Sequence, residues 1–137
     1  MIEEEINSDG IANLIFANSS EGLLITNGNG IIRYANPKVL EMFNYEYSEL
    51  IGEGVEVLVP KNIHSKHTSL RQNYEKNPTK RPMGVGSNLL GQCKGGDTFP
   101  VEVSLSPFEH LEEKYVLCFV TDVSVRRTQE EELSKAF

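Results

Sequence analysis

The sequence lacks tryptophan, has only two cysteines and carries fewer basic than acidic residues. With 13 Lys and Arg against 20 Asp and Glu, its formal charge is −7. A broad nucleic-acid interface needs clustered basic side chains that neutralise phosphates, so we expect no nucleic-acid partner. No run approaches the roughly 20 apolar residues of a membrane-spanning helix, and the acidic residues 1–5 do not resemble a secretory signal. These absences predict a cytoplasmic segment with no membrane contact.

The two cysteines, Cys93 and Cys118, lie far apart, and neither has a metal-ligating neighbour at the spacing of a zinc site. We therefore expect buried thiols in a reducing compartment rather than a disulfide or a bound zinc ion. The length of 137 residues, with 39% hydrophobic and 24% charged residues, is that of an ordinary globular protein. It predicts one domain with short appendages.

The strongest local signal is a hairpin over residues 22–35. Two apolar runs flank Asn27-Gly28-Asn29-Gly30, and Asn-Gly supplies the positive φ angles of a tight turn. Asn36 is a good helix N-cap, and Pro37 suits the first helical position. These residues predict a short helix from Pro37 to about Asn44.

The second half of the chain predicts a helix followed by strands. A polar helix is expected between Pro60 and Pro78, which bound a segment rich in polar side chains. From Phe99 to Leu105 every second residue is apolar, which is typical of a strand with one solvent-exposed face. Residues 115–121 are apolar on both faces and predict a central strand. The order of elements therefore predicts an α+β fold, an antiparallel sheet with helices packed on one face.

Both ends of the chain predict helices. Ile11, Leu14 and Ile15 form an apolar stripe at helical spacing, which would pack on the domain or on a partner chain. From Val125 onward the chain is highly charged and helix-prone.

Five segments, in this order, make residues 13–127 similar to the PAS (Per-Arnt-Sim) sensor domain family, of the S-box type found in bacterial sensor histidine kinases. One of them, Lys94-Gly95-Gly96-Asp97-Thr98-Phe99-Pro100, resembles the family's strand-turn-strand signature, with Gly95 where an Asp is usual. The five segments are Ile15 to Thr26, Ile31 to Pro37, Leu50 to Gly52, Lys94 to Ser104 and Thr121 to Ser124.

The resemblance implies a PAS fold, a curved five-stranded antiparallel sheet whose inner face encloses a small-molecule pocket with the long helix. It divides the chain into a lead-in helix (1–12), the PAS domain (13–124) and a C-terminal signalling linker helix (125–137). It also implies a homodimer formed through the flanking helices. The signal would pass through the C-terminal helix to an effector domain of the same polypeptide, such as a histidine kinase. The segment itself is then a sensor of a two-component system and not an enzyme.

The same resemblance suggests how a pocket would be lined. An apolar or amphipathic small molecule would contact four side chains, with a tyrosine as a polar handle. These side chains also have the character of ordinary core residues, and the resemblance leaves both interpretations open. The four are Met83, Val103, Leu105 and Cys118, and the tyrosine is Tyr74.

His67 is the candidate metal ligand, by the same resemblance. Counted from Pro60, it matches the proximal ligand of oxygen-sensing haem PAS domains, and a neutral imidazole can bind haem iron. Two arginines of those domains are absent here, since the distal one corresponds to Ser87 and the propionate-binding one to Asn73. We therefore expect no bound cofactor. A haem-based gas sensor and a ligand-free dimerisation scaffold are the alternatives.

Other chemistries fit less well. Gly95-Gly96-Asp97-Thr98-Phe99 resembles the GGDEF signature of diguanylate cyclases, but here it fits a turn before an alternating strand. Neither cysteine lies on the helix where a flavin photoreceptor of the LOV type needs one. Asp122 resembles a catalytic acid only by residue type, and we expect it to anchor the helix that follows the last strand.

Overall fold

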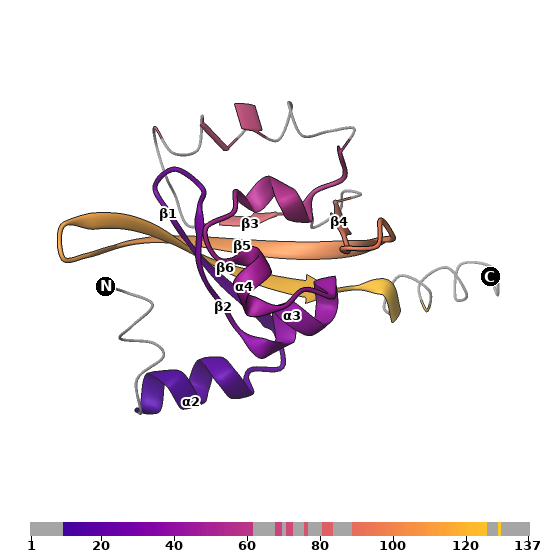
Figure 1. Ribbon diagram of the computed structural model, residues 1–137, viewed down its shortest axis with the longest axis horizontal. Coiled ribbons are helices and arrows are strands. Elements are labelled where there is room, and N and C mark those ends of the chain that lie inside the picture. The colour runs from indigo at the N-terminus through magenta and orange to yellow at the C-terminus, as the bar shows by residue number, and fades with distance from the viewer. Residues whose placement is uncertain are drawn as a thin grey trace.

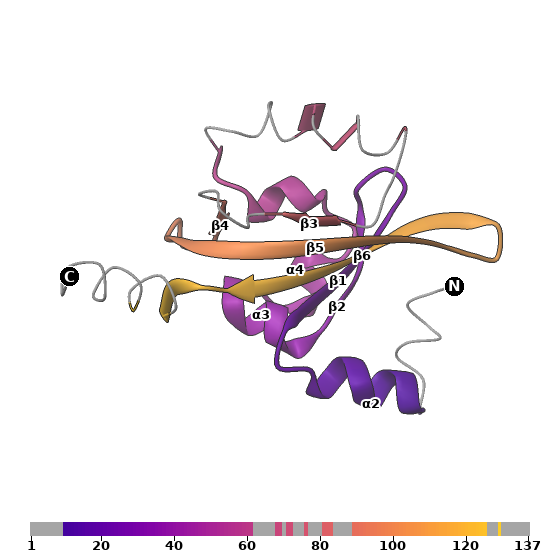
Figure 2. The same cartoon turned by 180° about the vertical axis from the view of Figure 1, so that it is seen from behind.

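The computed structural model describes residues 10–61, 68–69, 71–72, 76, 81–83, 89–125 and 129. A twisted antiparallel sheet carries a layer of short helices, and the long β5–β6 hairpin extends beyond the other strands (Figures 1 and 2). The elements in chain order are α2 (Ile11–Asn18), β1 (Gly22–Asn27), β2 (Ile32–Ala35), α3 (Pro37–Phe43), α4 (Tyr47–Leu50), the 3-10 helix η1 (Val55–Leu58), β3 (Arg81–Met83), β4 (Leu90–Gln92), β5 (Thr98–His110) and β6 (Glu113–Asp122).

The strands follow the order β2-β1-β6-β5-β3, and every pair is antiparallel. β4 also pairs with β5, next to the stretch that β3 uses, so β3 and β4 together fill one position and the sheet is five strands wide. This confirms the predicted fold class. β6 lies between β1 and β5, as expected for a strand that is apolar on both faces.

The β1–β2 hairpin forms where it was predicted, but its turn is longer than a two-residue Asn-Gly turn. The Gly30 N–H donates to the Asn27 carbonyl over 3.1 Å, and Gly30 alone in this loop adopts a positive φ, of 77°. The Asn27 Oδ1 accepts the N–H groups of Asn29 and Ile31, at 2.9 and 3.0 Å. The Asn side chain therefore organises the loop, and the second glycine supplies the left-handed residue.

A bulge in β2 places Ile32 and Tyr34, which are two residues apart, on opposite faces of the sheet. Ile25 pairs with Tyr34 while Thr26 pairs with Ile32, which leaves Arg33 without an opposite residue. Because a bulge shifts the alternation by one residue, Ile32 belongs to one apolar cluster and Tyr34 to the other.

α3 has the ends that the sequence predicts. Asn36 caps its first turn, Pro37 follows, and the helix stops at Asn44, which is left-handed with φ 60°. On the inner face of the sheet, α3 buries Val39 and Phe43. α4 is held by reciprocal hydrogen bonds between its first residues, a capping box that Glu46 and Glu49 form.

The sheet separates two apolar clusters. The inner cluster joins β1, β2, β5 and β6 to α3, α4 and η1, with members that include Leu24, Phe43 and Cys118. The outer cluster is smaller and consists of Ile25, Tyr34 and Tyr115 with partly buried neighbours. One of these neighbours is Phe16 of α2, so α2, which spans the predicted boundary between residues 12 and 13, packs on the sheet.

Candidate functional site

The predicted pocket-lining residues on strands lie next to one another on the sheet. Leu105 of β5 lies opposite Cys118 of β6, and Val103 lies opposite Met83 of β3. Val103 and Leu105 are two apart on one strand and so share a face. Sequence positions between 83 and 118 thus converge on one patch of the inner face. His67 and Tyr74, the other two predicted site residues, lie outside the described residues, as does His64.

Burial changes along this face. Val101 and Val120 are 3% and 4% exposed, whereas Val103 and Leu105 on the same side of β5 are only half-buried. Val101 packs in the inner cluster with Phe43 and Phe99, whereas Val120 lies opposite Val103, so burial falls along β5 from Val101 and also across the sheet from β6 to β5.

Backbone and ring approach each other closely at the end of the inner face where β4 pairs with β5. The Phe43 and Phe99 rings lie 5.1 Å apart, and a Cβ on Gly91 would come within 2.8 Å of the Phe43 ring. Only glycine therefore lets β4 pass the phenylalanine pair. Val103 and Leu105, two and four residues after Val101 on β5, keep part of their apolar surface exposed.

Both cysteines are free thiols; Cys118 is buried, as predicted, whereas Cys93 is half-buried. Burial raises the pKa of the Cys118 thiol to about 12, so Cys118 stays protonated and unreactive at neutral pH. Burial also raises the pKa of Cys93, and the nearby Asp97 and Asp122 carboxylates add to this shift. Its Sγ donates to the Met42 carbonyl over 3.4 Å. Neither thiol has the lowered pKa of a nucleophile.

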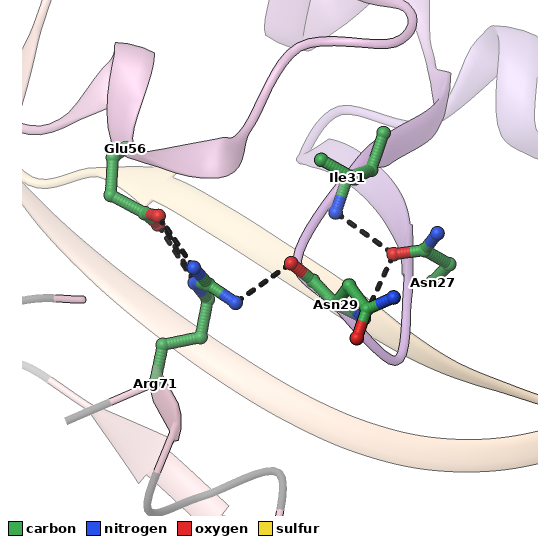
Figure 3. A network of polar contacts seen from close by, with 5 residues as sticks. All are labelled: Asn27, Asn29, Ile31, Glu56 and Arg71. Carbon is green, nitrogen blue, oxygen red and sulfur yellow. Dashed lines mark hydrogen bonds and ion pairs between the residues drawn. The ribbon is translucent and has the colours of Figure 1, made fainter. Parts of the chain in front are cut away.

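A polar contact that the sequence did not predict joins three distant segments (Figure 3). The Arg71 guanidinium binds both carboxylate oxygens of Glu56, at 2.8 to 3.1 Å, and donates to the Asn29 carbonyl over 2.7 Å. Such a bidentate, half-buried pair is stronger than an exposed one. A Cβ at Gly30 would lie 2.6 Å from the guanidinium, so glycine there serves both the positive φ and this contact. No local sequence pattern pairs residues 56 and 71. The glycine at position 30 is the sequence feature that this contact requires, and it does not by itself identify Arg71 as the neighbour.

The end of β6 is tied down at two points. The Asp122 Oδ1 accepts the Ser124 N–H over 2.9 Å and the Ser124 hydroxyl over 2.5 Å. The Val123 N–H donates to the Pro100 carbonyl at the start of β5, and Val123 is buried. Asp122 therefore anchors the turn into the following helical residues, as the sequence predicted.

Within the part of the chain that the structure describes, no three His, Cys, Asp or Glu side chains gather closely enough to hold a metal ion. Over the same residues, no helix is both long and apolar enough to cross a membrane.

The PAS domain family matches residues 20–125. The sensor protein FixL of Bradyrhizobium diazoefficiens is 27% identical over 104 residues, which cover 76% of this chain and 21% of FixL. The oxygen sensor protein DosP of Escherichia coli is 24% identical over 125 residues, which cover 91% of this chain and 16% of DosP. The chain thus spans about a fifth or less of the length of these curated relatives.

Among solved structures, the PAS domain of an HTR-like protein from Haloarcula marismortui superposes with a TM-score of 0.66. The superposition covers 79% of this chain and 85% of the Haloarcula domain. The two sequences are 21% identical, so the likeness supports the fold alone.

Proposed function

This chain belongs to the PAS domain family, and from that premise we propose that it is a cytoplasmic sensor module of a larger signalling protein. A small apolar or amphipathic molecule would bind the inner face, and the helix after Val125 would carry the signal to an effector such as a histidine kinase. The domain itself performs no catalysis in this proposal. Its similarity to part of FixL and part of DosP, which are both sensor proteins, supports the sensory role.

The observation that carries the proposal is the half-buried state of Val103 and Leu105, which pack against the buried inner cluster. Apolar side chains in the middle of a sheet are normally covered, since each buried methylene group contributes about 0.8 kcal/mol. Their remaining exposed surface, next to Cys118 and Met83 in register, offers an apolar contact for a ligand.

β5 links this patch to the exit of the domain. Val103 lies three residues from Pro100, whose carbonyl holds the Val123 N–H. A ligand that bends β5 would therefore move the start of the C-terminal helix. It shifts the equilibrium between two such states only by its difference in affinity for them.

Native mass spectrometry of gently purified protein tests the ligand. We expect a retained small molecule in the wild type and in Ser104→Phe, whose new ring stands on the opposite, exposed side of β5. Val103→Phe adds the same ring to the inner face and should abolish retention. Equal retention in both variants would place the ligand elsewhere, and no retained mass in any of them would favour the dimerisation scaffold.

α2 supplies an argument for a homodimer. Ile11, Leu14 and Ile15, the α2 stripe, are 75%, 60% and 62% exposed and lie on one side of the helix. A second copy would cover this stripe in the homodimer through the flanking helices that the family resemblance implies. Sedimentation over a range of concentrations should show association in the wild type and its loss when Leu14 and Ile15 are changed to Ser. Unchanged association would place the dimer contact on another element.

Haem binding is the second candidate, and the match to an oxygen sensor favours it. His67 would hold the iron as a neutral imidazole, whereas Ser87 and Asn73 supply no charged partner where the haem relatives have arginines. The Arg71 guanidinium is already engaged by Glu56. Purification with added haem, followed by an absorbance spectrum, decides the question. A Soret band that survives His64→Ala and disappears in His67→Ala would establish haem, and a colourless protein would remove it.

A further inference from the structure

The Asn36 carboxamide binds two helices at once, through its two ends. Its Oδ1 accepts the N–H groups of Leu23 and Val39, at 2.9 and 3.0 Å. Its Nδ2 donates to the carbonyl oxygens of Phe16 and Glu21, at 2.9 and 3.0 Å. The side chain is completely buried, and both of its ends are fully used.

The acceptor end of the Asn36 carboxamide faces the start of α3, and its donor end faces the end of α2. The Val39 N–H lies in the first turn of α3, and the Phe16 carbonyl lies in the last turn of α2. Helix ends leave such groups without partners inside the helix. A carboxamide offers a donor and an acceptor in a fixed geometry, whereas a carboxylate of the same shape only accepts. Asn36 therefore suits both helix ends, and Asp would suit only α3.

Among the residues that the structure describes, α2 has few other attachments. It has eight residues, a length that is marginal for a helix in water. Its N-cap, Gly10, makes no side-chain hydrogen bond, and the described side chains of α2 are at most half-buried. Apart from the Asn36 bond, the Phe16 ring meets the Tyr34 ring edge-on at 5.6 Å. A helix held by so little has a docking equilibrium that one hydrogen bond can shift.

We propose that Asn36 is the positioning residue that keeps α2 docked on the sheet, and that α2 can leave while α3 and the sheet stay folded. The docked position fixes the direction in which the α2 stripe points. The importance of that direction for dimerisation rests on the proposed function, whereas the docking itself does not. The same carboxamide also binds the start of β1, through the Leu23 N–H and the Glu21 carbonyl, so it joins α2 to the sheet as well as to α3.

Asn36→Asp tests the proposal. The variant keeps the oxygen that accepts from Val39 and Leu23. It replaces the NH2 group, which donates twice, by an oxygen that only accepts and that faces the Phe16 and Glu21 carbonyl oxygens. Hydrogen exchange followed by mass spectrometry should show that amides of residues 11–18 exchange at least about tenfold faster at neutral pH, which corresponds to about 1.4 kcal/mol of docking free energy. Protection of α3 should stay within about threefold of the wild type.

The pH dependence separates this role from a general loss of stability. A carboxyl group that faces two carbonyl oxygens has a raised pKa, and its protonated form donates again. Protection of α2 should therefore recover in part as the pH falls from about 8 to about 5. Burial raises the pKa of Tyr34 further above this range, and the wild type carries the same neighbours, so a recovery that is confined to Asn36→Asp comes from the new carboxyl group.

Asn29→Asp, an exposed change of the same charge in the β1–β2 loop, is the control and should leave α2 protection unchanged. Phe16→Ala should loosen α2 to the same extent at every pH. The proposal is wrong if α2 and α3 lose protection equally in Asn36→Asp, or if α2 exchange does not change. If Asn36→Asp does not fold, Asn36→Ser replaces it, since its hydroxyl still caps α3. Hydrogen exchange of α2 and of α3 is then compared in the same way. Because these readouts concern helix docking alone, they do not depend on whether the domain dimerises.

Discussion

α2 and α3 are both short apolar helices, of eight and seven residues, yet the structure uses them differently. α3 has a side-chain N-cap, a proline in its first turn, a left-handed C-cap and two completely buried side chains. α2 has an uncapped start and turns its isoleucines and leucine to solvent. α3 contains Lys38 and Glu41 and α2 contains no charged residue, yet α3 is the more deeply buried helix, so burial here does not follow composition. A group in this domain should influence stability according to how deeply it is buried, and the following substitutions test that rule.

The largest effect should come from truncating matched phenylalanines on the two helices. Phe43→Ala removes a ring that is 2% exposed and packs on Phe99, and we expect a loss of about 3–5 kcal/mol in the free energy of unfolding. Phe16→Ala removes a half-buried ring and should lower it by only about 1 kcal/mol. Urea unfolding measures both values. Similar losses would contradict the ranking by burial.

The half-buried Arg71 contact should give an intermediate effect. Gly30→Ala introduces a Cβ at a positive φ and into the guanidinium, and we expect roughly 1–2 kcal/mol of destabilisation in urea unfolding. Gly95→Ala, in open space at a turn, is the control and should change little. If the Glu56→Gln background reduces the effect of Gly30→Ala, the contact with Arg71 accounts for the difference.

Cys118 tests the buried interior by pH. Its thiol has a folded pKa of about 12, above the ordinary value of 9.0, because burial disfavours the thiolate. The unfolded chain therefore releases this proton first as the pH rises. The stability from Cys118 is complete below about pH 9 and falls by about 1.4 kcal/mol per pH unit between about 9 and 12. The difference in unfolding free energy between the wild type and Cys118→Ala should carry this slope. A pH-independent difference would contradict a buried thiol.

The smallest effect should come from the exposed ion pair between Glu49 and Lys94. The hydrogen bond from Lys94 holds the pKa of Glu49 below its usual value, so the contribution of this pair is present at neutral pH and is lost as the pH falls through the lowered pKa. Glu49→Gln should remove this small acid dependence, and added salt should weaken it. An NMR titration of the Glu49 side chain checks the direction, and an unshifted or raised pKa would show that the pair does not form in solution.

The parts of this fold that follow local rules could be predicted from the sequence. Asn36-Pro37 indicated the start of α3, the alternation from Phe99 indicated β5, and the doubly apolar run after Tyr115 indicated a central strand. The strand residues of the predicted pocket patch are adjacent in the sheet, although their contact with a ligand remains a prediction.

Long-range polar contacts and strained turns could not be predicted in the same way. The pairing of Arg71 with Glu56 depends on how three segments meet, and no spacing rule links them. Asn36 was recognised as an N-cap, but its donor half binds a carbonyl 20 residues earlier. The β5–β6 turn places Leu111 and Glu112 at φ values of 50° and 68°, which neither residue type favours. Pairing of the flanking strands imposes this turn, so the turn sequence alone gave no signal.

The register between β1 and β6 has a consequence for how this domain is made. Gly22, at the start of β1, lies opposite Val120, near the end of β6, so the first and last strands are neighbours in the middle of the sheet. During translation, β1 must wait until about 95 further residues have left the ribosome before the whole of its central partner β6 is available. Such distant pairing slows folding and leaves strand edges open in the meantime. In return, the chain enters and leaves the sheet at adjacent points.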